Sequence, residues 1–175
     1  MREVPGGKHN KRDFVLEEAK RRREKDKIIN VEEERVKVVI FALAGGDYAF
    51  YGGEVKEILS QSNIFYVPGT PGFIHGVINV RGEIESVINL AAFLELPDRT
   101  KAVNSRILIA AVDGIRSGVL VESVEDVLDI PVNSIKPPLS TLSQSLKGFI
   151  AGEFIHGNKT VTLLSVSRIF EKISV

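Results

Sequence analysis

The chain changes character near Val36, and this change constrains its fold more than any other feature. Residues 1–37 hold 12 basic and 9 acidic side chains, a net charge of +3, whereas residues 38–175 hold 11 and 14, a net of −3. The formal net charge of zero is therefore a cancellation. A segment that is more than half charged cannot bury enough apolar surface to build a core. We therefore expect a charged extension over residues 1–35 and a folded domain over residues 36–175.

The extension has helical character but no packing seam. Residues 13–27 are mostly good helix formers, and Asp13 can cap their first turn. Because apolar side chains occur only in the first turns, a coiled coil is not expected. The charge run is typical of a solvated, partly helical extension; the alternative is a basic contact segment for an acidic partner. A targeting peptide is not expected, because the segment lacks an apolar core and contains many acidic residues.

The remainder of the chain is a series of short β-type runs separated by glycine turns. Residues 106–112 are almost continuously apolar, which predicts a strand buried on both faces. Such spacing predicts an all-β fold of small barrels or a sandwich. The polar stretch 97–105 separates two sets of strands, so we expect two barrel-like halves divided near residues 97–105. The predicted strands are 36–43, 48–51, 55–59, 76–80, 84–90, 106–112, 116–121, 149–155 and 160–164, with short helices at 91–96 and 165–173.

Composition argues against several classes of chemistry. The chain has no cysteine, which excludes disulfides, thiolate metal sites and a cysteine nucleophile, and fits a reducing compartment such as the cytoplasm. Of its three histidines, His9 lies in the extension, and His75 and His156 are isolated in the sequence. We therefore expect no catalytic residues, no metal and no cofactor. An enzyme with an unrecognised site would need His75 or His156 in a pocket beside a carboxylate.

Acidic residues and glycine pairs have simple structural interpretations. Both glycine pairs, 45–46 and 52–53, lack the rest of a phosphate-binding loop and read as hairpin turns. One acidic cluster is interpreted as a solvated face; its members are Glu122, Glu125, Asp126 and Asp129. No run of about 18 apolar residues occurs, so no membrane insertion is expected. The net negative body, with aromatic residues away from lysine and arginine, argues against a nucleic-acid-binding barrel, which we keep as the alternative from another class.

Residues 55–90 form the most distinctive stretch. A rigid turn is predicted from Pro68, Gly69, Pro71 and Gly72, with residues 73–74 anchoring it on the core. A glycine at position 76 allows another chain or a ligand to approach the backbone closely. Arg81 and Gly82 form a hairpin tip within an apolar region, so the arginine should find a carboxylate partner. The natural candidate is Glu57, because its strand precedes the rigid turn.

This stretch also carries a family resemblance. Residues 68–82 read Pro-Gly-x-Pro-x-Phe-Ile-x-Gly-Val-x-Asn-x-Arg-Gly, a long and specific pattern that resembles the CheW-like family of bacterial chemotaxis adaptors. The resemblance covers about residues 36–173. It implies two intertwined five-stranded SH3-like barrels with short helices. It also implies a non-enzymatic cytoplasmic adaptor that couples methyl-accepting chemoreceptors to the regulatory domain of a CheA-type histidine kinase.

The resemblance further implies where the partners bind. In this family the groove that faces the cytoplasmic tip of the receptor lies between the barrels, and the matching residues here are Val55, Glu57, Gly76 and Arg81. An internal salt bridge between the two charged residues is an equally good interpretation, and both roles are compatible. The protein is expected to be a monomer on its own and a member of an array in the cell.

Two positions depart from the family pattern. Ser86 stands where the family usually has proline, and Asn89 where it usually has aspartate. Asn89 removes a charge and with it an ionic contact, whereas Ser86 restores a backbone N–H that a strand can use. These departures leave open whether the chain is the main chemotaxis adaptor or a divergent paralogue in another chemosensory-type pathway.

Overall fold

The computed structural model describes residues 17–18, 20–21, 33–60, 63–99, 104–138 and 144–174. The chain divides into two compact units, Met1–Glu33 and Glu34–Val175. In the first unit the described residues up to Arg21 are helical and exposed. The other predictions for the extension, including the cap at Asp13 and the position of His9, lie outside the described residues.

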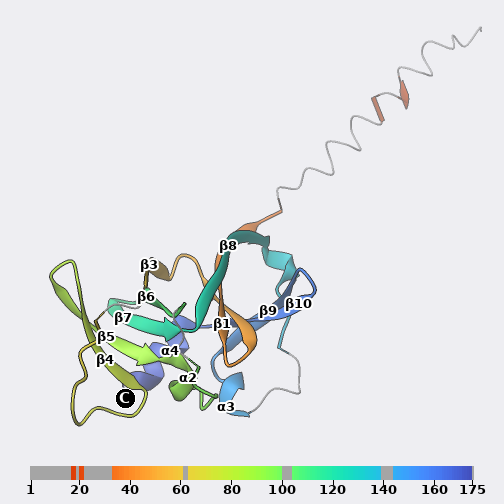
Figure 1. Cartoon of the computed structure of the whole chain (residues 1–175). Helices are drawn as coiled ribbons and strands as arrows, with labels where there is room; N and C mark the ends of the chain where they lie inside the picture. The colour runs from red at the N-terminus through yellow and green to blue at the C-terminus, as the bar shows by residue number, and fades with distance from the viewer. Residues whose placement is uncertain are drawn as a thin grey trace, which may run out of the picture. The chain divides into compact units, whose positions relative to one another are not determined.

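The second unit contains two five-stranded sheets, which Figure 1 shows on the left and right of the view. We call them barrel A, with strand order β8-β1-β2-β10-β9, and barrel B, with order β3-β6-β7-β5-β4. The prediction of an all-β fold with two small five-stranded barrels and short helices is confirmed. The strands are β1 (Arg35–Leu43), β2 (Gly46–Tyr51), β3 (Val55–Ser60), β4 (Ile74–Val80), β5 (Glu83–Asn89), β6 (Arg106–Val112), β7 (Ile115–Val121), β8 (Ser123–Pro131), β9 (Ile150–His156) and β10 (Lys159–Leu164). The helices are α2 (Leu90–Phe93), η1 (Val132–Ser134), α3 (Gln144–Lys147) and α4 (Val166–Ile173).

The predicted division near residues 97–105 is wrong. This stretch follows α2 and leads into β6, so the strands on either side of it belong to the same barrel B. The chain instead leaves barrel A after β2 and returns to it at β8. The later strand β10 then pairs in parallel with β2. A polar stretch marks a loop, but it does not report which strands pair across it.

The two halves of the domain repeat the same plan. The hairpin β4–β5 pairs Gly76 with Val87 and has a register shift next to this pair; the hairpin β9–β10 pairs Gly152 with Leu163 and shifts at the same place. Likewise, β3 pairs antiparallel with β6 and β8 with β1, each with one register shift. Residues 34–96 and 104–174 are therefore structural repeats, and each repeat contributes strands to both barrels.

Three apolar clusters hold the barrels together. In β1, Val38 and Ile40 point into barrel A, whereas Val39 and Phe41 belong to a large cluster shared by both barrels. In β6 the same alternation places Ile107 and Ile109 inside barrel B and their neighbours in the shared cluster. The prediction that 106–112 is buried on both faces is thereby confirmed. The shared cluster therefore packs the two barrels against one common hydrophobic core.

The closing helix begins where the sequence predicts. Ser165 caps α4 by accepting a hydrogen bond from the Arg168 amide, which satisfies one of the free donors of the first turn. Its buried side chains are Val166, Ile169 and Phe170, and they lie in the shared cluster.

Candidate partner-binding site

The predicted ion pair closes barrel B. Glu57 lies on β3, at one edge of the strand order, and Arg81 lies on the turn after β4, at the other edge. The Nη2 atom of Arg81 lies 2.8 Å from Oε1 of Glu57, as predicted from the sequence. Because the arginine side chain is 81% exposed, the pair contributes at most about 1 kcal/mol to stability. The arginine side chain thus remains accessible to a partner.

The turn that carries Arg81 has an unusual backbone. Both Arg81 and Gly82 have positive φ angles, 55° and 94°, as a tight two-residue hairpin turn requires. The Gly82 amide donates to Oδ1 of Asn79 at 2.8 Å, which fixes the turn from its own strand.

Gly76 is buried beneath the chain itself. Its φ is 150°, and a Cβ atom there would lie 2.4 Å from the carbonyl oxygen of Phe65. Phe65 exchanges two backbone hydrogen bonds with Val77, at 2.8 and 2.9 Å, so the segment after β3 runs directly over the glycine. The close approach predicted at this position therefore involves the chain's own backbone. The glycine is required by the fold, and any effect on a partner is indirect.

The remaining predicted residues are mainly structural. Val55 is half-buried and packs against the shared cluster. The turn residues Pro68, Gly69, Pro71 and Gly72 lie in the segment before β4, where the amide of Ile74 donates to the carbonyl of Pro71. Phe73 and Ile74 pack against the shared cluster, so the predicted anchoring is confirmed.

The edge strands present apolar side chains that were not predicted as site residues. Ile58 on β3 is 39% exposed, and Val127 on β8 is 46% exposed. They occupy equivalent positions, each at the second pair beyond the register shift of its ladder. Ile58 pairs with Leu108 of β6. Val127 pairs with Val39 of β1. Phe65 and Tyr66 are more exposed still, at 62% and 74%. Exposed large apolar side chains on strand edges are suitable for contact with another protein.

Barrel A has a second side-chain contact between its outer strands at the equivalent place. Asp126 pairs with Ile40 in β1 as Glu57 pairs with Ile109 in β6. Its Oδ2 lies 3.4 Å from Nε2 of His156, at the tip of the β9–β10 hairpin. The acidic cluster is only partly the solvated face that was predicted, since Glu125, Asp126 and Asp129 are exposed whereas Glu122 is half-buried.

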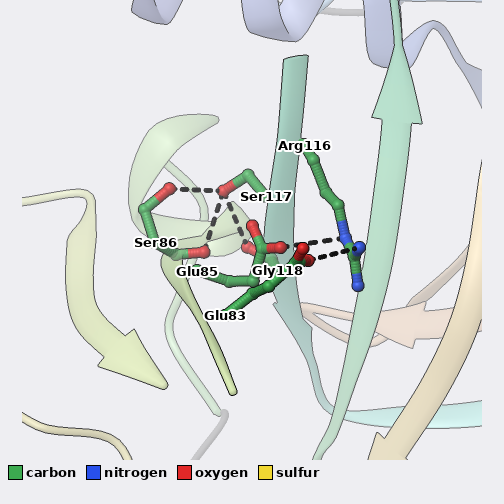
Figure 2. Close-up of polar contacts among 6 residues, drawn as sticks. All are labelled: Glu83, Glu85, Ser86, Arg116, Ser117 and Gly118. Atoms are coloured by element: carbon green, nitrogen blue, oxygen red, sulfur yellow. Dashed lines mark hydrogen bonds and ion pairs between the residues drawn. The ribbon is translucent and has the colours of Figure 1, made fainter. Parts of the chain in front are cut away.

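The first departure from the family pattern makes a polar contact within barrel B, as Figure 2 shows. The hydroxyl oxygens of Ser86 and Ser117 lie 2.8 Å apart, and the Ser117 hydroxyl also lies 2.9 Å from the carbonyl oxygen of Ser86. Beside them, Arg116 pairs with Glu83 at 3.1 Å and with the nearly buried Glu85 at 2.9 Å. These contacts join β5 to β7, the parallel pair at the centre of the barrel.

The second departure caps a helix. Asn89 is buried, and its Oδ1 accepts a hydrogen bond from the Ala92 amide at 3.1 Å, which caps α2. Its Nδ2 donates to Oδ2 of Asp98 at 2.8 Å. An aspartate could accept from the amide but could not donate to Asp98. The asparagine thus ties the helix start to the loop after it.

One half-buried acid lies where the chain crosses from barrel A to barrel B. Glu54 follows β2, and burial raises the pKa of its carboxyl, although hydrogen bonds from the backbone of Val166 and Tyr51 and the charge of Lys56 act in the opposite direction. Its Oε2 atom is buried without a hydrogen-bond partner. The ionised form of this residue is therefore disfavoured by the fold.

Within the described residues, no cluster of three or more histidine, cysteine or acidic side chains could hold a metal ion. Among the helices described, none has the length and apolar character needed to cross a membrane. The fold and the site together define a small double-barrel β domain whose exposed apolar edges suit protein binding.

Comparison with known proteins identifies the family. The model described as the CheW-like domain matches residues 37–174, so the chain belongs to the CheW-like family. It is 28% identical over 138 residues to the chemotaxis protein CheW of Bacillus subtilis, covering 79% of this chain and 88% of that protein. It is 29% identical over 138 residues to CheW of Thermotoga maritima, covering 79% and 89%.

A solved structure has the same architecture. The scaffolding protein TtCheW from Thermoanaerobacter tengcongensis superposes with a TM-score of 0.72 and 33% identity, covering 79% of this chain and 94% of that chain. This similarity identifies the two barrels as SH3-like. The recognition of the CheW-like family from residues 68–82 is confirmed.

Proposed function

We propose that this protein is a non-enzymatic adaptor that couples chemoreceptors to a CheA-type histidine kinase in chemotaxis signalling. Family membership supports the proposal, as do relatives named as chemotaxis proteins and a structural neighbour named as a scaffolding protein. The mechanism is binding alone: the protein holds two partners in a fixed relation.

The observation that carries the proposal is the equivalence of the edge strands β3 and β8. Each has an exposed apolar residue next to an acid, Ile58 beside Glu57 and Val127 beside Asp126, at matching register positions. A receptor tip is a hairpin of two antiparallel helices, so two similar edges can each contact one helix. Apolar contacts supply the affinity of such an interface.

We assign the kinase contact to the exposed aromatic pair Phe65 and Tyr66. Aromatic residues are enriched in protein interfaces because they bury a large area at a low entropic cost. The pair is held rigidly, since Phe65 is hydrogen-bonded to Val77 over the buried Gly76. In this assignment Gly76 positions the aromatic pair, whereas Glu57 and Arg81 hold the barrel edge beside it.

Co-sedimentation with receptor-containing membranes and kinase tests the receptor assignment. Ile58→Asp and Val127→Asp should each lower receptor binding at least about tenfold, the loss expected for charging a central apolar contact. The matched control is Ile115→Asp, because Ile115 is also an isoleucine, is 40% exposed and lies next to the β6–β7 turn rather than on an edge strand. Equal binding by all three folded variants would show that the paired edges do not contact the receptor.

A further inference from the structure

A hollow of about 460 Å³ lies beside the helices α2 and α4. Its lining comes from segments far apart in the sequence and includes Phe73, Phe93, Glu95, Phe149 and Lys172. None of its lining residues lies on β3 or β8, and Figure 1 shows α2 and α4 in the lower part of the view, away from those edge strands. The hollow is therefore separate from the proposed receptor contact, and its volume is in the range of small-molecule sites.

Three phenylalanine rings form the apolar wall of the hollow. Phe93 lies edge-on to Phe73, with ring centroids 5.4 Å apart and an interplanar angle of 83°. On its other side, its centroid lies 5.1 Å from that of Phe149, with the planes tilted by 60°. All three rings are half-buried and pack against the shared cluster, so the core holds them in place. Because the positive edge of one ring attracts the negative face of another, a further ring can add to this group.

One carboxylate and one ammonium group also line the hollow. The side chains of Glu95 and Lys172 are exposed, and neither forms an ion pair with another residue that the structure describes. Glu95 has a φ of 57°, a left-handed conformation that favours glycine. The chain therefore carries an acid at a position where glycine would be less strained. Together the two side chains offer one negative and one positive charge beside the aromatic wall.

Hydrogen bonds fix the turn that carries the acid. The amide of Leu96 donates to the carbonyl of Ala91 at 2.8 Å, which closes the end of α2. Asn89, one of the two departures from the family pattern, caps the start of this helix and donates to Asp98 beyond its end. The backbone amide of Asn89 also donates to the carbonyl of Phe73 at 2.8 Å. The wall of the hollow is thus formed before any ligand arrives.

We propose that this hollow binds a free aromatic α-amino acid. The ring of the ligand packs against the three phenylalanine rings, its carboxylate pairs with Lys172 and its α-ammonium group pairs with Glu95. Both protein side chains are long and exposed, so they can turn to the two charged groups of the ligand. A free amino acid carries both charges beside one side chain, whereas a residue inside a peptide carries neither. The hollow therefore fits the free amino acid better than a peptide segment, and this assignment does not depend on the adaptor function.

Titration of the isotope-labelled chain with L-phenylalanine, followed by NMR, tests the proposal. Saturable shifts are expected at the amides around the hollow, such as those of Phe93, Phe149 and Lys172, with a Kd of about 1 mM or tighter for a ligand of this size. The absence of saturable shifts at these amides up to about 10 mM ligand, ten times that value, would overturn the proposal.

Three analogues separate the parts of the ligand. Hydrocinnamate lacks the ammonium group and phenethylamine lacks the carboxylate, so each should bind about threefold more weakly, as expected for the loss of one exposed ion pair. L-Alanine keeps both charges but lacks the ring, and should bind at least about tenfold more weakly. If hydrocinnamate and phenethylamine bind as tightly as phenylalanine, the charges take no part and the assignment to an amino acid is wrong.

Two charge-neutralising variants locate the two ends of the ligand. Lys172→Gln should weaken phenylalanine binding about threefold and leave phenethylamine binding unchanged, whereas Glu95→Gln should weaken phenylalanine binding equally and leave hydrocinnamate binding unchanged. The matched control is Lys147→Gln, because Lys147 is also an exposed lysine but does not line the hollow. All three changes are at exposed side chains, so the melting temperature should stay the same. Equal phenylalanine affinity in Lys172→Gln and Lys147→Gln would contradict the proposed site.

Discussion

Barrels A and B are built on one plan but differ in the side chains they present. Both have a glycine under a crossing segment, Gly76 in barrel B and Gly152 in barrel A. Both also have a side-chain contact between opposite edges, Arg81 with Glu57 in barrel B and His156 with Asp126 in barrel A. The crossing residues differ, since Phe65 bridges to Val77 in barrel B whereas Lys136 bridges to Glu153 in barrel A. The residues that recur in both barrels are required to close a small barrel. The residues that differ between the barrels are available to specify partners.

The largest expected effect concerns the recurring glycines. Gly76→Ala should lower the free energy of unfolding by about 3 kcal/mol or more, because the new Cβ meets a backbone carbonyl and the positive φ is strained. Gly152→Ala should cost less, about 1–3 kcal/mol, because the new Cβ would lie 2.5 Å from the Ile135 side chain but 2.9 Å from the backbone carbonyl of Lys136, and no positive φ adds strain. Urea unfolding of both variants measures the difference. A stable Gly76→Ala variant would refute the assignment of this glycine to the fold.

The helix caps should give the next largest effect. Asn89→Ala should cost about 1–2 kcal/mol, because it removes the cap of α2 and leaves Asp98 without this amide donor. The counterpart Ser165→Ala removes only the cap of α4 and should cost about 1 kcal/mol. Thermal unfolding of the two variants provides the comparison, and a larger loss for Ser165→Ala would contradict it.

Glu54 should make stability depend on pH. Because its pKa is raised in the folded state, its favourable contribution is present below the ordinary value of 4.5 and is lost as the pH rises through the folded-state value. The Glu54→Gln side chain cannot ionise. The free energy of unfolding of this variant, relative to the parent, should therefore be higher at pH 7 than at pH 4. Urea midpoints at the two pH values test this, and a pH-independent difference would show that the carboxyl is not destabilised by burial.

The closing ion pairs should have the smallest effect. Arg81→Ala and His156→Ala should each lower the free energy of unfolding by no more than about 1 kcal/mol, since the Arg81 side chain is mostly exposed and those of His156 and Asp126 are about half exposed. Any loss should shrink in high salt, which screens exposed charges. A loss of several kcal/mol at Arg81 would mean that its pair acts as a buried one.

Much of the architecture could be predicted from local patterns. The burial of 106–112, the closing helix at 165–173 and the pairing of Arg81 with Glu57 depend on nearby sequence or on simple charge complementarity. The strand β8 was missed because Glu125, Asp126 and Asp129 give it the composition of a solvated loop. As the outer edge of a barrel, however, this strand needs apolar side chains on one face only.

The parts that could not be predicted depend on long-range pairing. The assignment of strands to barrels follows from the parallel ladders of β2 with β10 and β5 with β7, which no local pattern reports. The exposure of Ile58 and Val127 is set by which edges remain open, and the approach at Gly76 by where the segment at Phe65 crosses. The departures at Ser86 and Asn89 become interpretable only with their partners Ser117 and Asp98 in place.

The most direct test exchanges a residue that differs between the barrels. Phe65→Lys gives barrel B the side chain that barrel A has at the equivalent bridge, Lys136. Because Phe65 is mostly exposed, the free energy of unfolding should change by no more than about 1 kcal/mol. Binding to the kinase regulatory domain, measured by calorimetry, should fall by at least about tenfold. Unchanged kinase binding together with lost stability would contradict the division between recurring residues that build the fold and differing residues that select partners.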